Sequence, residues 1–190
     1  MTALVVDNEN LKTSPRGLQF IAQEEGCVLK PYKDVAGLRT IGIGHLIKPG
    51  EDFPDGVSIT KERAYEILSQ DLAHAENALK KNAQVPLNQN QFDALVSFGF
   101  NCGTGVYVKS GVMTAVNSGD FDIVPAKLLE WSKARVNGTL QTVAGLFNRR
   151  KREGDLFLEE PSADTDDCSQ SDPITPWTKS MMMEEIGRAH

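Results

Sequence analysis

Two acidic residues nine positions apart, Glu25 and Asp34, have the contrasting surroundings that acid–base chemistry requires. Glu25 follows Leu18 and Ile21 at helical spacing, so it shares their apolar helix face, where desolvation favours the protonated form of a carboxyl group. Asp34 lies in a polar turn and should stay ionised. One protonated and one ionised carboxyl group are what hydrolysis of a glycosidic bond usually needs.

Helical phase alone does not establish this chemistry, because most glutamates near helix ends are surface residues. The neighbouring Glu24 is expected to point about 100° away from Glu25, toward solvent. The residues that follow Glu25 decide between the structural and the chemical interpretation.

The segment from Glu25 to His45 contains three short motifs at defined separations. The dipeptide E-G comes first, the pattern Y-x-D-x-x-G begins at Tyr32, and the pattern T-I-G-x-G-H begins at Thr40. Together they closely resemble the active-site signature of phage-type lysozymes, glycoside hydrolase family 24. Nine residues separate Glu25 from Asp34 and six separate Asp34 from Thr40, as in that family. Such a match over twenty-one residues is far more specific than an isolated short motif.

The resemblance implies roles for the polar residues of this segment. Glu25 would be the general acid, and Asp34 and Thr40 would position the attacking water on the far side of the scissile bond. In an inverting enzyme that water adds directly, whereas in a retaining relative Asp34 would be the nucleophile. The two outcomes correspond to carboxyl separations of roughly 6.5–9.5 Å and 5–5.5 Å. His45 is interpreted as a brace of the hairpin through hydrogen bonds rather than as a proton shuttle.

Two later segments extend the resemblance. Residues 92–103 resemble the family's central buried helix, in which Asn101 occupies a polar position near the cleft. Asn101 would either support the cleft and the substrate or cap the end of the helix. Residues 145–153 resemble the segment in which an arginine approaches the catalytic glutamate. Arg149 is the best match and Arg150 the second, and a guanidinium there would favour the ionised glutamate, against the effect of desolvation.

The hydrophobic periodicity and the capping residues predict a mainly helical α+β fold, which the resemblance makes lysozyme-like. A helix should begin at Ser14-Pro15 and end at Gly26. A short antiparallel hairpin or three-stranded meander is expected in residues 28–47. The predicted helices that follow are a long one over residues 60–82, one opened by a capping box of Asn88 and Gln91, and three over residues 106–118, 121–134 and 143–159.

The predicted domain organisation is one catalytic domain with a tail. Residues 1–160 form the lysozyme-like catalytic domain, whose first 12 residues are an irregular lead-in. The domain is expected to divide into a small lobe over residues 14–59, a connecting helix over residues 60–82 and a helical lobe over residues 83–160. Residues 161–190, rich in Ser, Asp, Thr and Pro, are predicted to be an acidic, flexible C-terminal tail.

The net charge of −6 is concentrated in that tail. Residues 1–160 carry 18 basic and 20 acidic residues, a balance of −2, whereas residues 161–190 carry 2 and 6, a balance of −4. A near-neutral domain offers no basic face for duplex nucleic acid, so no nucleic-acid partner is expected. The run Arg149–Arg152 is the exception, and most of it is predicted to be a solvated helix face.

The cysteine and histidine content favours neither a disulfide framework nor a metal site. Cys27, Cys102 and Cys168 are an odd number at wide spacing, as is typical of free thiols in a reducing cytoplasm. No second histidine or cysteine stands at ligand spacing from His45, so neither a metal nor another cofactor is expected.

The sequence has neither a secretory segment nor the ~18 consecutive apolar residues that a membrane-spanning helix needs. We therefore expect no stable membrane insertion. The resemblance implies a monomer that acts on peptidoglycan glycan strands and stays in the host cytoplasm until lysis. Action in the periplasm and cell wall would then require a separate holin-type pore.

Three functions fit the sequence to different degrees. The resemblance favours an endolysin, a muramidase that causes host cell lysis by hydrolysing the β-1,4 bond between N-acetylmuramic acid and N-acetylglucosamine. A lytic transglycosylase would use one glutamate and no water, which the water-positioning pattern of Asp34 and Thr40 argues against. A wall-binding module without activity on the same fold is disfavoured by the intact Glu25, Asp34 and Thr40.

Overall fold

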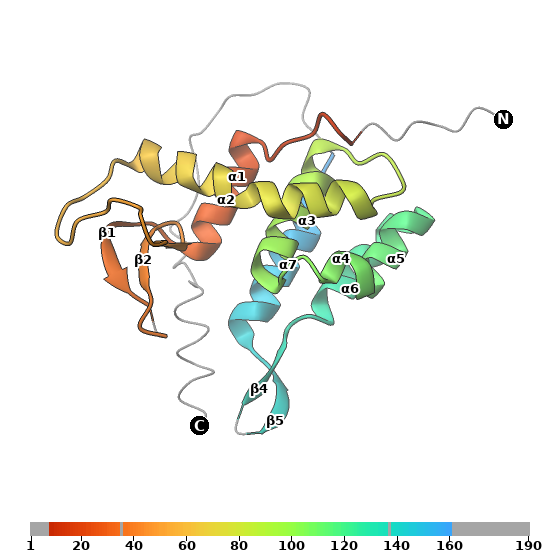
Figure 1. Cartoon of the computed structure of the whole chain (residues 1–190). Helices are drawn as coiled ribbons and strands as arrows, with labels where there is room; N and C mark the ends of the chain where they lie inside the picture. Colours follow the sequence, from red (N-terminus) through yellow and green to blue (C-terminus); the bar gives the residue numbers. More distant parts are fainter. Residues whose placement is uncertain (1–7, 35, 137, 161–190) are drawn as a thin grey trace. The chain divides into compact units, whose positions relative to one another are not determined.

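The computed structural model describes residues 8–34, 36–136 and 138–160, with only the backbone described for Val136. Its helices and strands are labelled in Figure 1. The described residues separate into two compact units. We name them the sheet unit, residues 18–71 and 134–141, and the helical unit, residues 8–17, 72–133 and 142–160. The predicted acidic tail, residues 161–190, lies outside the described residues.

Helix α1, Pro15–Glu25, begins and ends where the capping residues predict. The hydroxyl oxygen of Ser14 accepts a hydrogen bond from the backbone N–H of Gly17 at 3.0 Å, so Ser14 is the N-cap. At the other end Gly26 has φ 76°, a conformation that residues with a Cβ rarely adopt. Its backbone N–H donates to the carbonyl oxygen of Ala22 at 2.9 Å. The chain therefore leaves the helix directly after its last residue and turns into the sheet.

Three short strands follow α1 and form an antiparallel sheet in the order β1-β2-β3, which confirms the predicted meander. The strands are β1 (Val28–Lys33), β2 (Arg39–Gly42) and β3 (His45–Leu46). Tyr32 on β1 pairs with Thr40 on β2. Ile41 on β2 pairs with His45 on β3 and is completely buried. The sheet thus brings residues of the second and third sequence motifs onto neighbouring strands, while Glu25 of the first motif ends the preceding helix.

Helix α2, Lys61–Asn82, is the long helix predicted over residues 60–82. Thr60 caps its first turn, because the side-chain oxygen of Thr60 accepts a hydrogen bond from the backbone N–H of Arg63 at 3.1 Å. Its apolar residues at helical spacing are buried, namely Ala64, Ile67, Leu68, Leu72, Ala75 and Leu79. The helix begins in the sheet unit and ends in the helical unit.

Helix α3, Gln89–Cys102, lies in the core of the helical unit. The side chain of Asn88 accepts a hydrogen bond from the backbone N–H of Gln91 at 2.8 Å. In return, the side chain of Gln91 accepts one from the backbone N–H of Asn88 at 2.9 Å, which confirms the predicted capping box. Every residue from 90 to 99 is buried. The other helices of the unit are α4 (Val106–Lys109), α5 (Gly111–Ser118), η1 (Phe121–Ile123), α6 (Val124–Leu129) and α7 (Ala144–Leu158). Helix α7 packs along α3 and α6, as Figure 1 shows.

Two of the later helices differ from the prediction. The helix expected over residues 106–118 is interrupted at Ser110, whose hydroxyl oxygen accepts from the backbone N–H of Met113 at 3.3 Å and so starts a new helix. The helix expected over residues 121–134 ends at Leu129. From Lys133 the chain forms a two-stranded hairpin that was not predicted. Its strands are β4 (Lys133–Val136) and β5 (Thr139–Thr142).

The segment before α1 is irregular, as predicted for the lead-in, and residues 1–7 of that lead-in lie outside the described residues. Hydrogen bonds nevertheless hold it to the rest of the helical unit. The side chain of Asn8 donates to the carbonyl oxygen of Val85 at 2.9 Å and accepts from the backbone N–H of Leu87 at 3.0 Å. The backbone N–H and the hydroxyl of Thr13 both donate to the Glu76 carboxylate, at 2.8 and 2.7 Å. These contacts fix the position at which α1 starts.

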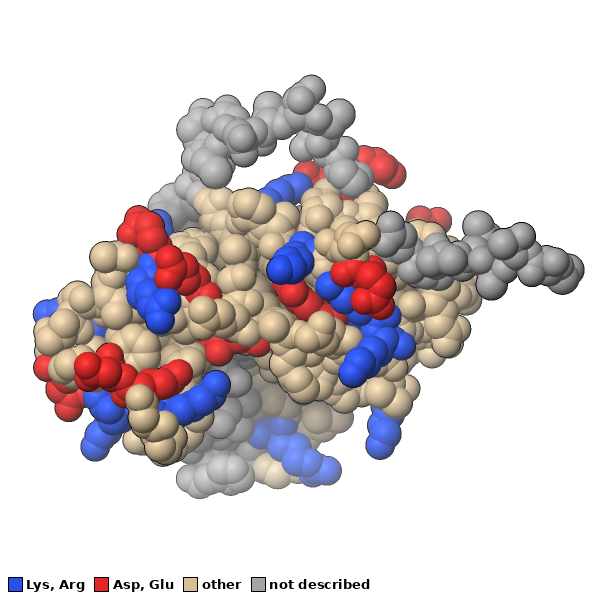
Figure 2. Space-filling view, turned by 45° about the horizontal axis from the view of Figure 1, so that its top comes forward, with Lys and Arg blue, Asp and Glu red and all other residues tan. Residues whose placement is uncertain are grey.

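Charged side chains on the surface are mixed in sign. Figure 2 shows acidic and basic residues interleaved on the visible face rather than gathered by sign. Exposed ion pairs join Arg16 to Glu159, Arg39 to Asp55, Arg63 to Glu66, Lys127 to Glu130 and Lys151 to Asp155. Such pairs contribute only about 0–1 kcal/mol each, so burial of apolar residues holds the fold together. Within the described part of the chain, no helix is long and apolar enough to cross a membrane.

The contact between α3 and α4 gives a test of the packing in the helical unit. A Cβ on Gly99 would lie 1.9 Å from the hydroxyl oxygen of Tyr107, which is buried and donates to the carbonyl oxygen of Leu95 at 2.8 Å. We expect Gly99→Ala to lower the free energy of unfolding by about 1–3 kcal/mol because of overpacking. In an unconstrained helix the same change would raise it by about 0.5–1 kcal/mol. Urea unfolding measures the difference.

Gly105→Ala is the matched control. Gly105, the N-cap of α4, also has φ −59° and ψ −21°, and no atom of the described residues other than its chain neighbours lies within 4 Å of a Cβ placed there. This variant should lose at most about 1 kcal/mol, because Ala is a poorer N-cap than Gly but meets no clash. Equal stability of the Gly99→Ala and Gly105→Ala variants would contradict the packing of Tyr107 against α3.

Candidate active site

Glu25 is the last residue of α1 and is buried, with 5% of its surface exposed. It continues the face formed by Ile21 and Ala22, which are also buried, so its predicted place on the apolar face of α1 is confirmed. The turn between β2 and β3 lies against its carboxyl group. A Cβ on Gly44 in this turn would stand 3.9 Å from Oε2 of Glu25. The carboxyl group is therefore enclosed by the end of its own helix and by sheet backbone.

The prediction that Glu24 faces solvent was wrong, because only 4% of its surface is exposed. Gly17 and Ile21 precede Glu24 at helical spacing, and both are buried. A Cβ on Gly17 would lie 2.5 Å from Cγ of Asp93, so there is no room for a side chain at position 17. Helix α1 thus has a second buried face, and the glycine in its first turn was the sequence signal for it.

Asp34 lies in the turn between β1 and β2, where its side chain and backbone organise the turn. Its Oδ1 accepts hydrogen bonds from the backbone N–H groups of Ala36, at 2.9 Å, and Leu38, at 2.8 Å. Its backbone N–H donates to the carbonyl oxygen of Leu38 at 2.9 Å. Both side-chain hydrogen bonds end on Oδ1, so Oδ2 can accept one from a water molecule. The carboxylate is held in one orientation by the turn itself.

Thr40 lies on β2 and is buried, with 5% exposed. Its hydroxyl group donates a hydrogen bond to the carbonyl oxygen of Leu38 at 3.2 Å. Because the proton is used in this way, the lone pairs of Oγ1 can accept a hydrogen bond from a second group. Asp34, directly after β1, and Thr40, near the start of β2, are therefore two hydrogen-bond acceptors at the same end of the β1–β2 hairpin.

Tyr32 connects these groups, although the sequence analysis did not select it as a site residue. Burial raises the pKa of its phenol, and the negative charges of Asp34 and Glu25 raise that pKa further. The phenol therefore lies within the electrostatic field of both carboxyl groups. Tyr32 also pairs with Thr40 on β2, so this one residue neighbours Thr40 and feels the charges of both Glu25 and Asp34. The sequence signal that could have identified Tyr32 as a site residue was its place in the pattern Y-x-D.

His45 follows Gly44 and joins three elements of the sheet unit. Its Nδ1 lies 2.8 Å from Oδ2 of Asp71 on α2, and its Nε2 lies 3.0 Å from Oε2 of Glu51 in the loop before α2. Its ring also meets the ring of Phe53 edge to face, with centroids 6.2 Å apart. The hydrogen bonds fasten the end of the sheet to α2 and to the loop.

Glu51 was not foreseen from the sequence. Its carboxylate accepts from the backbone N–H of Lys48 at 2.7 Å as well as contacting His45. These two hydrogen bonds, with that of Lys48 the stronger cause, lower the pKa of Glu51. Its position three residues after Lys48, in a loop without hydrophobic periodicity, gave little sign of this role.

A buried ionic cluster on α7 faces α3 in the helical unit. Arg149 and Arg150 are 1% and 0% exposed, so the prediction of a mostly solvated basic run was wrong for both. The carboxyl group of Glu153, also completely buried, lies 3.1 Å from Nε of Arg149 and 2.7 Å from Nε of Arg150. The hydroxyl group of Ser97 on α3 donates to Glu153 at 2.8 Å. Glu153 follows Arg149 by four residues and Arg150 by three, and both spacings bring opposite charges together on a helix.

Asn101 belongs to the same cluster. Its Oδ1 accepts a hydrogen bond from Arg150 at 3.1 Å, and Nη1 of Arg150 lies 2.7 Å from Sγ of Cys102. The guanidinium also stacks over the ring of Phe98, 5.1 Å from its centroid. Helix α3 ends at Cys102, and Gly103, with φ 84°, is its C-cap. The side chain of Asn101 is thus bound to α7.

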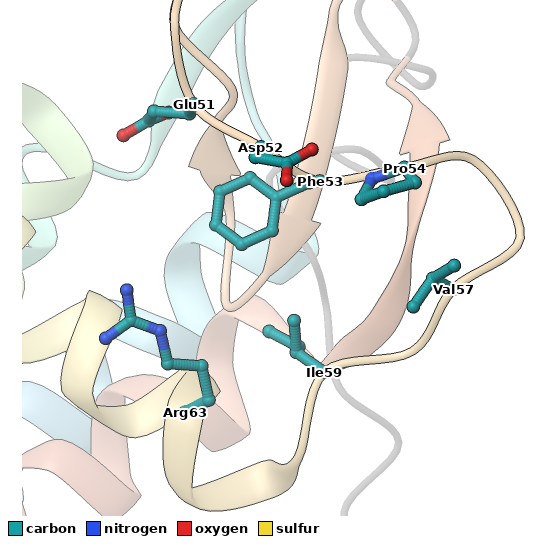
Figure 3. Close-up of a pocket in the computed structure, with 7 residues that line it drawn as sticks. All are labelled: Glu51, Asp52, Phe53, Pro54, Val57, Ile59 and Arg63. Atoms are coloured by element: carbon teal, nitrogen blue, oxygen red, sulfur yellow. The ribbon is translucent and has the colours of Figure 1, made fainter.

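A pocket of about 410 Å³ opens in the sheet unit, outside the group around Tyr32. Figure 3 shows the residues that line it. They are Glu51, Asp52, Phe53, Pro54, Val57, Ile59 and Arg63. None of the sequence-predicted site residues is among them. Among the residues that the structure describes, no cluster of three or more His, Cys, Asp and Glu side chains is arranged to hold a metal ion.

Solved structures similar to this chain have related folds. The endolysin from Escherichia coli O157:H7 phage FAHEc1 is 35% identical, with a TM-score of 0.72 over 79% of this chain and 95% of that one. The muramidase domain of SpmX from Asticaccaulis excentricus is 34% identical, with a TM-score of 0.70 over 78% of this chain and 99% of that one. The mainly helical α+β fold and the carboxyl groups at its sheet therefore define a lysozyme-like glycosidase.

The sequence comparisons identify the family. Residues 22–153 match the phage lysozyme family, so the chain belongs to it. The endolysin of Salmonella phage P22 is 38% identical over 149 residues, which cover 78% of this chain and 99% of that protein. The family assigned from the motifs between Glu25 and His45 is thereby confirmed.

The pKa of Tyr32 gives a test of the site geometry that does not depend on activity. We expect both Glu25→Gln and Asp34→Asn to lower this pKa, because a neutral amide no longer opposes formation of the phenolate. The pH titration of the tyrosine ring carbons by NMR measures it. Glu24→Gln, a neighbouring change of the same kind, is the control and should have a smaller effect. A pKa of Tyr32 unchanged in both site variants would show that the carboxyl groups are not near it.

The buried cluster predicts a large difference between two carboxylates on α7. Glu153→Gln should lower the free energy of unfolding by about 3–5 kcal/mol, because two buried guanidinium groups lose their shared partner. Asp155→Asn removes a carboxylate that pairs with exposed Lys151 on the same helix, and should change it by less than about 1 kcal/mol. Urea unfolding of the two variants measures the contrast. Similar values for both would mean that Glu153 is not buried between the arginines.

Proposed function

We propose that this chain is a muramidase that hydrolyses the β-1,4 bond between N-acetylmuramic acid and N-acetylglucosamine in peptidoglycan. The proposal is supported by membership of the phage lysozyme family and by relatives that are named endolysins and a muramidase domain. The observation that carries it is the burial of Glu25 at the end of α1, against the turn at Gly44, in the same sheet unit as Asp34 and Thr40. We assign the catalytic domain to residues 1–160.

Glu25 acts in this proposal as the general acid. Leaving-group departure requires a proton on the glycosidic oxygen, and a donor must hold its proton until that moment. Glu25 is buried at the end of α1, so its carboxyl group is shielded from bulk water. The backbone of Gly44 limits the directions in which its carboxyl group can turn. Both features suit a proton donor of fixed orientation.

Asp34 and Thr40 position the attacking water. A nucleophilic water must be held by acceptors that orient its lone pair and take up its proton. Oδ2 of Asp34 can take up that proton, because the turn hydrogen bonds end on Oδ1. Oγ1 of Thr40 can accept a second hydrogen bond from the water and so orient it, since its own proton is donated to Leu38. Direct attack by this water inverts the anomeric carbon. Retention would instead make Asp34 the nucleophile, and the anomer released first distinguishes the two.

The remaining site residues have supporting roles. His45 braces the end of the sheet on Asp71 and Glu51, next to the turn against Glu25. Arg149 is assigned, from its place in the family motif, as the arginine that approaches the catalytic glutamate. Asn101 supports the cleft from α3. We further propose a monomer that waits in the host cytoplasm and reaches the cell wall through a separate holin-type pore.

Replacement of Glu25 tests the proposal. Glu25→Gln keeps the shape of the side chain but cannot donate the proton, so cleavage of purified peptidoglycan should fall by about 10²–10⁴-fold. Turbidity clearing and release of soluble fragments measure this. Glu24→Gln is the matched control, since Glu24 is equally buried on the same helix, and it should retain activity. A folded Glu25→Gln variant with parental activity would overturn the assignment.

A further inference from the structure

We propose that the pocket in the sheet unit binds the peptide stem of peptidoglycan. We name it the loop pocket, lined by Glu51, Asp52, Phe53, Pro54, Val57, Ile59 and Arg63. Its occupant is a short peptide segment that carries a carboxylate, an amine and small aliphatic side chains. This inference rests on the proposed muramidase function and deepens it, because it separates recognition of the stem from cleavage of the glycan.

The walls of the loop pocket combine an apolar floor with opposite charges. Phe53, Val57 and Ile59 provide the apolar surface, and Val57 is 56% exposed. Figure 3 shows Asp52 and Phe53 on one side of the space and Arg63 with Ile59 on the other. A ligand that filled the space would therefore meet a cation, an anion and aliphatic surface at once.

The loop that forms the pocket is fixed by hydrogen bonds before any ligand binds. Nη2 of Arg39 donates to the carbonyl oxygen of Phe53 at 2.8 Å and to Asp55 at 2.7 Å. The backbone N–H of Ile59 donates to the carbonyl oxygen of Leu29 on β1 at 2.9 Å. With Glu51 held by His45, both ends of the loop are anchored to the sheet. A preformed site loses little conformational entropy on binding, which favours the interpretation as a ligand site.

The charge of Arg63 is available to a ligand. Its Nη1 pairs with Oε2 of Glu66 at 2.8 Å, but the two side chains are 48% and 62% exposed. An ion pair of that exposure is weak and can be exchanged for a carboxylate that also contacts the pocket floor. Asp52, exposed at the opposite wall, has the sign needed to receive an amine.

The chemistry of the substrate decides which part of peptidoglycan fits. N-acetylglucosamine and stem-bearing N-acetylmuramic acid have uncharged rings. The glycan therefore has no charged group that Arg63 or Asp52 could bind. The stem has alanine methyl groups, free carboxylates and the amine of a diamino acid. The pocket volume, about 410 Å³, lies within the usual range for small-ligand sites, roughly 300–1,000 Å³. Charge and volume therefore both match a short stretch of the stem.

The loop pocket is also connected to the proposed acid. Glu51 on its rim binds His45, and His45 follows Gly44, whose backbone lies against the carboxyl group of Glu25. A stem seated in the pocket would hold the glycan from the same unit that carries the catalytic group. Since the pocket residues do not touch the reacting atoms, their contribution should appear in substrate binding rather than in turnover.

The experiment compares Arg63→Ala with the parent chain on two substrates. One is a set of soluble glycan chains that carry their peptide stems, and the other is the same chains after an amidase has removed the stems. Loss of a charged hydrogen bond should raise KM for the stem-bearing chains about tenfold and leave kcat unchanged. KM for the stripped chains should not change. Lys127→Ala, which removes the cation of a similarly exposed pair with Glu130 on α6, is the control and should change neither.

The other outcomes overturn the inference. Equal losses on both substrates would show that Arg63 acts on the glycan or on the fold, and no loss on either would show that the stem binds elsewhere. If the parent chain cleaves neither substrate, the proposed function fails by itself. In that case an NMR titration with the free tripeptide L-alanyl-γ-D-glutamyl-diaminopimelic acid tests the loop pocket independently of cleavage. Shifts of the backbone amide signals of Phe53, Val57 and Ile59 would support binding in the pocket. Shifts confined to other residues, or none, refute it.

Discussion

The backbone of the turn between β2 and β3 lies against the carboxyl group of Glu25, and the rest of the sheet unit depends on this close approach. It requires that α1 end directly at Glu25, which Gly26 permits with its positive φ. It also requires a turn that reverses within two residues, which Gly44 permits with φ 71°. Residues with a Cβ would be strained by roughly 1–2 kcal/mol at either position. With both glycines in place, the strands carry Thr40 and Asp34 to the same region as the helix end.

The helical unit is organised by a different interaction, the buried ionic cluster between α3 and α7. Two arginines share the carboxyl group of Glu153, and Arg150 continues to Asn101. A buried ion pair adds little net stability compared with apolar packing, but the loss of one partner is costly. The cluster therefore fixes the register of α7 on α3. It also sets the orientations of Arg149 and Asn101, the two residues of this unit that we assign to the site.

Local patterns predicted much of this arrangement. Helices α1 and α3 were predicted with their caps, because Ser14, Gly26 and the capping box act through neighbours within four residues. Helix α2 was predicted from its hydrophobic periodicity alone. The hairpin over residues 133–142 was missed, although Asn137-Gly138 is the dipeptide most typical of such turns. Each strand there is only four residues long, too short for a clear alternation, and the predicted helices over residues 121–134 and 143–159 left residues 135–142 unassigned.

The candidate site was predictable only in part, for a physical reason. The motifs identified Glu25, Asp34 and Thr40 because their spacing along the chain carries the information. The partners of these groups come from distant segments, and no spacing predicts them. Glu51 and Asp71 meet His45 across the loop and α2, and Gly17 lies against Asp93 of α3. Such contacts exist only once the chain has folded.

The central claim is that this chain cleaves the glycan by adding water, with Glu25 as acid and Asp34 and Thr40 holding the nucleophile. Mass spectrometry of purified peptidoglycan digested by the parent chain tests it most directly. We predict fragments that end in reducing N-acetylmuramic acid, each heavier by one water than the corresponding anhydro form. Fragments ending in 1,6-anhydro-N-acetylmuramic acid would contradict the account, because they form without the water that Asp34 and Thr40 are proposed to position.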